Sequence, residues 1–379
     1  MKFFSVEKLR HFWHYFKMDT PLFLLIIALS SFSLMVLYSA SAGSMLTIYK
    51  QVFHFSLAIS AMLVIAQIPP YLLRRFSPYL MLFGIFLLVL VLFFGSSSGG
   101  AQRWLDLGIV RFQPSEIMKV IVPIAIASIL SGKTLPPKPL SILLSIIAIV
   151  AIVLLIARQP DLGTSLLIGA SGVYVLFFSG IRVQILKNNW LNLAFIGSLI
   201  AGSGYIAWHY LLMAYQKTRI LTLIDPSSDP LGSGYHILQS KIAIGSGGIF
   251  GKGLEQGSQS QLNFLPEHTT DFIFAVVAEE LGFIGVLLLL TLYGLIIYRA
   301  FVISFQSEDN FSKLLGASLT LTFFTYIFVN IGMVSGLLPV VGVPLPLVSY
   351  GGSSLITLMS SFGIIMAIRK HKKPRYLQQ

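Results

Sequence analysis

The stretch from Pro139 to Ala157 reads PLSILLSIIAIVAIVLLIA and contains no charged residue. A run of about 20 apolar residues has the length that crosses the hydrocarbon core of a bilayer as an α-helix. Similar runs recur along the chain, and we place ten of them, near residues 20–40, 50–68, 79–95, 114–131, 139–157, 162–180, 190–212, 272–298, 314–335 and 349–368. The sequence therefore predicts an all-α polytopic membrane protein, with a single membrane domain over residues 1–379.

Composition supports a membrane environment. Of the 379 residues, 55% are hydrophobic and only 11% are charged, whereas a soluble domain carries about 25% charged residues. The formal charge of +12 could indicate nucleic acid, but in a membrane protein it is better explained by cytoplasmic loops and anionic lipid, so we expect no nucleic-acid partner. The chain has no Cys, which excludes disulfides, thiolate metal sites and Cys nucleophiles.

The distribution of basic residues predicts the orientation. Ten spans place both termini on one side, and if that side is the cytoplasm, 17 of the 26 Lys and Arg residues lie in cytoplasmic segments. Such a bias is typical of cytoplasmic loops. Ala40-Ser41-Ala42 resembles a signal-peptide cleavage site, but the apolar stretch before it is long for a signal peptide, so we expect an uncleaved first helix.

One connection is much longer than the others. Residues 213–270, between the seventh and eighth predicted helices, contain no full span, and the orientation makes them a large external loop. Loops longer than about 15 residues are usually functional or disordered. The piece from Tyr235 to Ile244 is half apolar and too short to span, so we expect it to lie in or near the membrane interface.

The glycine-rich run Gly245-Ser246-Gly247-Gly248-Ile249-Phe250-Gly251-Lys252-Gly253 invites comparison with a nucleotide-binding P-loop. A P-loop with Gly251-Lys252 as its GK pair needs Gly at 246 and Ser or Thr at 253, and the chain has Ser246 and Gly253. The run also falls outside the cytoplasm. It is instead a flexible hinge, or a backbone that a bulky ligand approaches closely.

Asp271 lies where the long loop meets the eighth apolar run. Asp fills helix N-caps well, so capping is one explanation. Carboxylates at the entry of a membrane span are costly, however, and are usually functional. Glu267 and Glu279 lie nearby in the sequence, and Glu279 shares a helix face with Asp271 if the helix is regular.

Several polar residues are expected on the same external side as Asp271, where a cationic cluster suits a pyrophosphate. Each also has an ordinary explanation as an interfacial anchor, an ion pair or a helix start. No zinc-ligand spacing and no Ser-His-Asp arrangement is evident, so we expect no such metal site. The candidates are Arg103, Trp104, Arg111, Arg158, Lys217, Arg219, Lys241, Lys252, Glu267 and Ser349.

Long motifs at these positions resemble a known family. They are Ala101 to Gly108 (AQRWLDLG), Phe112 to Glu116 (FQPSE), Arg158 to Thr164 (RQPDLGT), Asp229 to His236 (DPLGSGYH), Asp271 to Glu280, and Asn330 to Ser354. Over nearly the whole chain the sequence is similar to the SEDS proteins (shape, elongation, division, sporulation). Pro339 to Pro346 looks like the RodA branch rather than the FtsW branch.

The resemblance implies a ten-helix fold with a large external loop after the seventh helix, in the bacterial cytoplasmic (inner) membrane. It implies a peptidoglycan glycosyltransferase that polymerises lipid II, with Asp271 matching the family's catalytic Asp. It also implies partnership with a class B penicillin-binding protein and the elongation machinery. One departure is visible: the family has His two residues before the Asp, whereas this chain has Thr269 there and His268 one residue earlier.

In the expected reaction, a base takes a proton from the acceptor sugar hydroxyl, which attacks an anomeric carbon and releases undecaprenyl pyrophosphate. No cofactor is required by the sequence, although a divalent cation (Mg²⁺ or Mn²⁺) near Asp271 and Glu267 is an open alternative. Two other functions fit a polytopic protein: a lipid II flippase, and a non-catalytic scaffold for the penicillin-binding protein. The chain shows no internal repeat of the kind common in transporters.

Overall fold

The computed structural model describes residues 18–98, 101–106, 111–132, 135–159, 161–181, 197–198, 202, 204–229, 232–262, 264–265 and 267–371. The long helices in these ranges are α2 (Thr20–Ala40), α3 (Met45–Ile65), α4 (Pro70–Phe94), α5 (Pro114–Leu130), α6 (Pro139–Ala157), α7 (Leu162–Phe178), α12 (Ile273–Phe305), α13 (Asn310–Val334) and α14 (Ser353–Lys370). Shorter helical elements are a π-helix at Ala207–Leu211, α9 (Ala214–Ile224), a 3₁₀ turn at Pro226–Ser228, α10 (Ser233–Ser246) and α11 (Ser258–Gln261). A small antiparallel sheet has the order β1 (Ser96–Ser98), β2 (Ala101–Asp106), β3 (Arg111–Phe112).

The helices confirm the prediction of a helical membrane protein. In the described residues, six helices are long and apolar enough to cross a bilayer, namely α2, α3, α4, α6, α12 and α13. Helices lie at nine of the ten predicted spans, and most of the remaining one, 190–212, lies outside the described residues. Helix α6 has the predicted bounds. Helix α4 begins earlier than predicted, at Pro70, because Pro suits the first turn of a helix.

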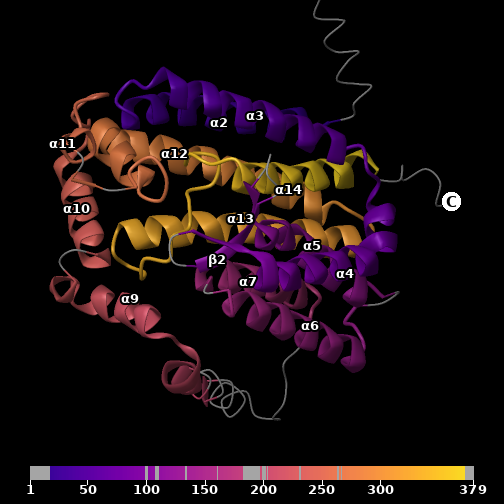
Figure 1. Cartoon of the computed structure of the whole chain (residues 1–379). Coiled ribbons are helices and arrows are strands. Elements are labelled where there is room, and N and C mark those ends of the chain that lie inside the picture. The colour runs from indigo at the N-terminus through magenta and orange to yellow at the C-terminus, as the bar shows by residue number, and fades with distance from the viewer. Residues whose placement is uncertain are drawn as a thin grey trace, which may run out of the picture.

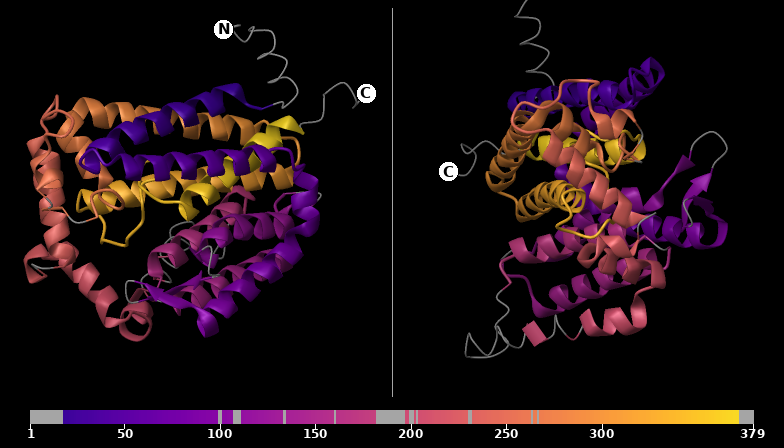
Figure 2. Two further views of the ribbon diagram at one scale, coloured as in Figure 1. Left: turned by 45° about the horizontal axis from the view of Figure 1, so that its top comes forward. Right: turned by 90° about the vertical axis from the view of Figure 1, so that its left-hand side faces the viewer.

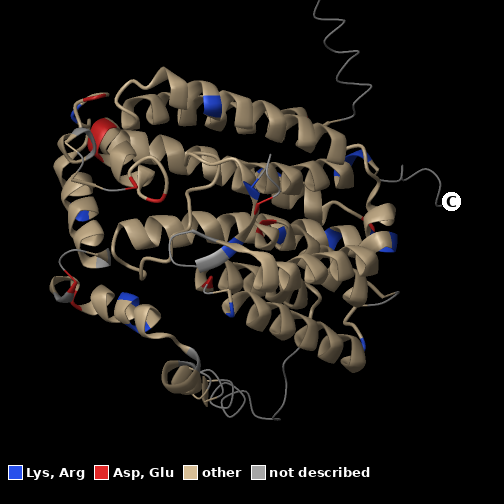
Figure 3. Cartoon of the chain, viewed as in Figure 1, with Lys and Arg blue, Asp and Glu red and all other residues tan. Residues whose placement is uncertain are grey.

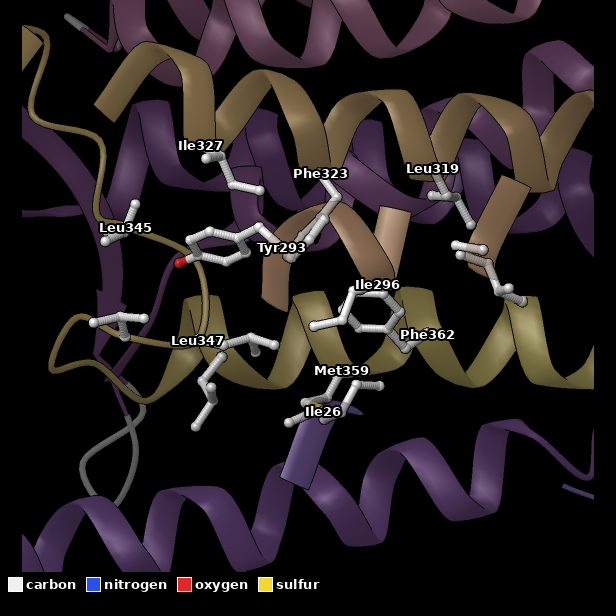
Figure 4. Close-up of a cluster of buried hydrophobic side chains, with 14 of the residues drawn as sticks. Ile26, Tyr293, Ile296, Leu319, Phe323, Ile327, Leu345, Leu347, Met359 and Phe362 are labelled. Carbon is white, nitrogen blue, oxygen red and sulfur yellow. The ribbon is translucent and has the colours of Figure 1, made fainter. Parts of the chain in front are cut away.

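The long helices run alongside one another and form a bundle (Figures 1 and 2). The α2–α3 pair covers α12 and α14 on one side, and α5 and α13 lie between these and α4, α6 and α7. Buried apolar side chains hold the middle of the bundle together (Figure 4), and the Tyr293 hydroxyl donates to the Pro346 carbonyl at 2.6 Å. Helix α10 lies across one end of the bundle, which we call the loop end.

The opposite end, which we call the termini end, brings together the start of α2 and the end of α14. Asp19 is fully buried there and forms ion pairs with Arg299 of α12, at 2.8 Å, and with Arg369 of α14. Between the two ends, the long stretches of α2, α6 and α12 are almost free of charged residues (Figure 3), as a hydrocarbon environment requires.

Helix α12 is broken at Gly282, whose φ and ψ are 63° and −161°. The backbone groups released by the break pair with residues 247–253, which we call the glycine turn. The amides of Lys252 and Gly253 donate to the carbonyls of Glu279 and Glu280, both at 3.0 Å. In the opposite direction, the amides of Phe283 and Ile284 donate to the carbonyls of residues 248 and 249, at 3.0 and 3.2 Å.

Only glycine allows this close approach. A Cβ at Gly251 would lie 2.1 Å from the Glu280 carbonyl oxygen, and a Cβ at Gly247 would lie 1.9 Å from that of Ala278. Of the two explanations offered by the sequence, close approach of the backbone is therefore observed. The approaching partner is a helix of the same chain rather than a ligand.

Candidate active site

Asp271 lies at the loop end of the bundle, just before α12, and the backbone around it is held by side chains from other elements. The buried Asn330 side chain of α13 donates to the Asp271 carbonyl at 2.8 Å and to the Val343 carbonyl at 2.7 Å. The Ser349 hydroxyl donates to the Thr270 carbonyl at 2.5 Å. The segment before α12 is therefore joined to α13 and to the 339–352 loop.

The Asp271 side chain does not cap the helix. Phe272 occupies the N-cap position, and no side chain makes a capping hydrogen bond there. Gly342 faces the carboxylate instead, because a Cβ at this position would lie 3.4 Å from Asp271 Oδ2. Gly342 has φ of +71°, a conformation that side chains disfavour. Capping therefore does not account for this aspartate.

The surroundings raise the pKa of Asp271 to about 6. Burial is the largest cause, the negative charge of Glu267 adds to it, and the Arg219 guanidinium opposes it. A carboxylate with this pKa is mostly ionised at neutral pH and is a stronger base than an exposed Asp. These are the properties of a general base that works near pH 7.

Glu267 is held near Asp271 in an unusual backbone conformation, with φ of +57°. Its carboxylate accepts from the Thr270 hydroxyl at 2.6 Å, and its carbonyl accepts from the Thr270 and Phe272 amides at 3.0 and 3.2 Å. A non-glycine residue at positive φ is strained, and such strain is often found at functional sites. Glu267 therefore supplies a fixed negative charge beside Asp271.

His236 of α10 covers the other side of this segment and was absent from our sequence-based candidates. Its ring stacks on Phe272 with the ring centroids 5.5 Å apart. Burial lowers the pKa of His236, against the opposing charges of Glu267 and Asp229. The motif Asp229 to His236 was visible in the sequence, but nothing in it indicated contact with Phe272.

A cavity of about 750 Å³ opens beside this segment, between α6, α7, α9 and the 339–341 segment. Most of its lining is apolar, and the same cavity is lined by Arg103, Arg158 and Arg219. Val341 belongs to the lining and is the neighbour of Gly342, which faces Asp271. The structure thus brings three of the predicted basic residues together in one cavity. Asp271 is not part of its lining, but the charge of one lining residue, Arg219, acts on the Asp271 carboxylate.

Asp161 also lines this cavity; it lies in the motif Arg158 to Thr164 but was not among the predicted site residues. It caps α7 by accepting from the Thr164 amide at 3.2 Å, and it accepts from the Gln113 side chain at 2.8 Å. Arg103 lies 3.9 Å from the same carboxylate. Asp161 therefore orients Arg103 without a close ion pair.

Three other predicted basic residues lie elsewhere. Arg111 pairs with Asp106 at 2.7 Å on the surface of the small sheet. Lys252 pairs with the buried Glu279 at 2.6 Å. The Lys241 ammonium group lies against Gly336, just beyond the end of α13.

The remaining candidates have structural contacts. Lys217 lies over the Trp208 ring, 6.0 Å from its centroid. Trp104 belongs to β2, and its carbonyl accepts from the Ser96 hydroxyl at 3.3 Å. His268 contacts the Leu265 carbonyl through Nδ1 at 2.8 Å. Within the described ranges, no group of three or more His, Asp or Glu side chains is arranged to hold a metal ion.

A half-buried carboxylate of raised pKa, beside an apolar cavity with three guanidinium groups, suits an amphipathic anion that reaches the site from a membrane. This combination defines a class of membrane protein that handles lipid-linked phosphates. Comparison with known proteins identifies the family within that class. The model of the cell cycle protein family of FtsW, RodA and SpoVE matches residues 19–374.

Relatives and solved structures agree with this match. The chain is 49% identical to the peptidoglycan glycosyltransferase MrdB of Escherichia coli K12 over 362 residues, 96% of each chain. It is 34% identical to the stage V sporulation protein E of Bacillus subtilis, over 94% of this chain and 98% of that one. The solved structure of Thermus thermophilus RodA is 26% identical and superposes with a TM-score of 0.69, covering 94% of this chain and 98% of that one.

A further solved structure comes from work on the coordination of polymerisation and crosslinking by a peptidoglycan synthase complex. One of its chains is 31% identical, with a TM-score of 0.80, and the match covers 94% of this chain and 99% of that one. The chain described here therefore belongs to the FtsW, RodA and SpoVE family.

Proposed function

We infer that this chain is a peptidoglycan glycosyltransferase that polymerises lipid II into glycan strands during cell elongation. The observation that carries this inference is the position of Asp271, a carboxylate with a pKa of about 6, beside an apolar cavity lined by three arginines. The names of the relatives support the same activity. The RodA branch of the family supports a role in elongation.

In the proposed reaction, the ionised Asp271 carboxylate accepts the proton of the acceptor sugar hydroxyl. The hydroxyl oxygen forms a bond to the anomeric carbon of the second lipid II molecule. The bond from that carbon to the pyrophosphate oxygen breaks, and undecaprenyl pyrophosphate leaves with the electron pair. Asp271 then returns its proton to water. A positioned general base contributes about 10²–10⁴-fold to such a step.

The reaction also requires binding of the pyrophosphate leaving group and of the isoprenoid chain, and the cavity can supply both. Arg103, Arg158 and Arg219 line it, and guanidinium groups bind phosphates by paired hydrogen bonds and stabilise the charge that develops on the leaving group. The apolar walls of α6 and α7 suit the isoprenoid part of the same substrate. One cavity can therefore hold both halves of a lipid-linked pyrophosphate.

We also propose that the chain has ten spans in the bacterial cytoplasmic membrane, with both termini in the cytoplasm. The start of α2 and the end of α14 meet at the termini end, whereas Asp271 and the cavity lie toward the loop end. This arrangement supports an extracytoplasmic active site, where lipid II is polymerised. Reporter fusions after residue 379 and within residues 213–270 test it, and a cytoplasmic signal from the loop would contradict it.

The proposed partner is a class B penicillin-binding protein. The similar chain from a peptidoglycan synthase complex supports this partner, because crosslinking by that complex requires a second activity. The purified chain should polymerise lipid II faster in the presence of its partner. Equal rates with and without the partner, in the same detergent, would contradict the proposal.

Fluorescent lipid II provides the test of function. Purified protein with its partner should yield long glycan strands, separable from the substrate on a gel. Transport of lipid II across vesicle membranes without any polymer would instead identify a flippase. The absence of both activities, in a preparation that still binds its partner, would identify a scaffold.

A further inference from the structure

Two exposed apolar side chains lie at the tip of the glycine turn, in the external loop. Phe250 is 80% exposed and Ile249 is 62% exposed. An exposed Phe next to an exposed Ile on a tight turn is costly in water, because both side chains together present a large apolar surface. The turn itself is rigidly held, because its backbone pairs with α12 on both sides of Gly282.

The pairing brings this tip to the outer edge of a membrane span. Gly282 divides α12 into residues 273–281, of which 273–280 are all buried, and a second part that begins at Phe283. Phe283, Ile284 and Leu287 of the second part are at least half exposed, as side chains that face lipid are. Because the Ile284 amide donates to the Ile249 carbonyl at 3.2 Å, the tip lies beside the first turn of this lipid-facing row.

The end of α2 gives an independent reference for depth. Ser39, one residue before the end of that span, donates to the Glu280 carboxylate at 2.5 Å, and its hydroxyl accepts from the Glu255 amide at 2.7 Å. Glu280 therefore lies level with the outer end of α2. The second part of α12 runs from Phe283 to Phe305, about 34 Å at 1.5 Å per residue, which is enough for one crossing.

The charge next to the tip is neutralised. Lys252 follows the tip closely, and its ammonium group pairs with the buried Glu279 at 2.6 Å and contacts the Ser258 hydroxyl at 2.9 Å. A neutral, apolar turn can enter the boundary between headgroups and acyl chains, where exposed Phe and Ile side chains favour binding.

We propose that the tip of the glycine turn, Ile249 and Phe250, is inserted among the acyl chains of the outer leaflet and anchors the external loop to lipid. The lipid-facing row of α12 continues directly into this tip, so the surface of the bundle that contacts lipid extends onto the loop. The anchor would fix the depth of α10, which begins at Ser233 and ends at Ser246, just before the turn.

The absence of Cys from the chain permits a direct test. Single Cys variants Phe250→Cys, Phe283→Cys and Gln256→Cys, each with a nitroxide spin label, are placed in lipid nanodiscs without any partner protein. Phe283 is the lipid-facing reference. Gln256, exposed on the same loop, is the aqueous reference. Unchanged thermal unfolding temperatures establish that the variants fold.

The label at position 250 is expected to be more accessible to oxygen than to a water-soluble nickel chelate, as at position 283 and unlike position 256. If position 250 instead resembles position 256, the tip lies in water and the proposal is wrong. A label at 250 that is accessible to nickel alone, and becomes protected only when the penicillin-binding protein is added, also overturns it in favour of a protein contact. None of these outcomes depends on polymerase activity.

Discussion

Two aspartates stand directly before the first turns of membrane helices, at opposite ends of the bundle. Asp19 caps α2 by accepting from the Leu22 amide at 2.9 Å, is fully buried, and is paired with Arg299 and Arg369. Asp271 caps nothing, and in the described residues no hydrogen bond or ion pair is formed by its carboxylate. An aspartate near the start of a membrane helix is structural where its charge is neutralised and chemically available where it is not.

From the comparison of the two aspartates, we expect the largest effect on polymerisation for Asp271→Asn. Asn is nearly isosteric but cannot accept the proton, so the polymerisation rate should fall by about 10²–10⁴-fold. Because the carboxylate forms no hydrogen bond or ion pair with the described residues, and burial disfavours its charge, the thermal unfolding temperature should not fall. Gel analysis of fluorescent lipid II products measures the rate. A folded variant that polymerises at nearly the wild-type rate would show that the base lies elsewhere, and Glu267 would be tested next.

The matched change at the other end, Asp19→Asn, should have the opposite pattern. Asn can still cap α2, but the ion pairs with Arg299 and Arg369 are lost. We expect a loss of about 1.5–3 kcal/mol in the free energy of unfolding, typical of charged hydrogen bonds. Thermal unfolding in detergent measures it. The folded fraction should retain its activity per molecule, and selective loss of activity with unchanged stability would contradict the structural role.

Two glycine-to-alanine variants distinguish the effect of backbone strain from the effect of an added side chain next to Asp271. Gly342→Ala adds a Cβ 3.4 Å from Asp271 Oδ2 at φ of +71°, whereas Gly180→Ala adds one at φ of +78° with nothing within 4 Å among the described residues. Both should cost about 1–2 kcal/mol of stability. Only Gly342→Ala should also lower activity. Equal activities for the two folded variants would show that the contact with Gly342 is unimportant.

The pH dependence of the rate should show the smallest shifts. Because the base must be ionised, the wild-type rate should fall as the pH drops through about 6. Glu267→Gln removes a charge that raises the pKa of Asp271, so the fall should move to lower pH. Arg219→Gln removes a charge that lowers it, so the fall should move to higher pH. Initial rates, normalised to each variant's maximum, measure the position, and identical profiles would exclude Asp271 as the titrating group.

Much of the fold could be predicted because a helix that crosses lipid needs a run of about 20 apolar residues. Pro139 to Ala157 is a helix with the predicted bounds, since an apolar run of that length has few alternatives. Residues 74 and 75 of α4 are both Arg, which obscured its first turns. The break at Gly282 could not be predicted, since its hydrogen-bond partners lie 27 to 35 residues earlier in the chain.

The site was predicted less completely than the fold. Asp271 was singled out as a candidate because a carboxylate at the entry of a span is unusual. The grouping of Arg103, Arg158 and Arg219 depends on three distant segments that line one cavity, and sequence spacing does not contain that information. That Glu279 shares a face with Asp271 stays a prediction; the pairing of its carboxylate with Lys252 was not predicted. His236 contacts Phe272, and Asp161 contacts Gln113 and Arg103; these tertiary contacts do not follow from sequence spacing.

The break in α12 has a consequence for the order in which the chain is made. The carbonyls of Glu279 and Glu280 and the amides of Phe283 and Ile284 pair with the glycine turn. Unpaired backbone groups in lipid cost several kcal/mol each. Because translation proceeds from the N-terminus, the turn leaves the ribosome before α12 and is available when that helix enters the membrane. A circular permutation that placed residues 247–253 after α12 would make the helix insert with four backbone groups unpaired.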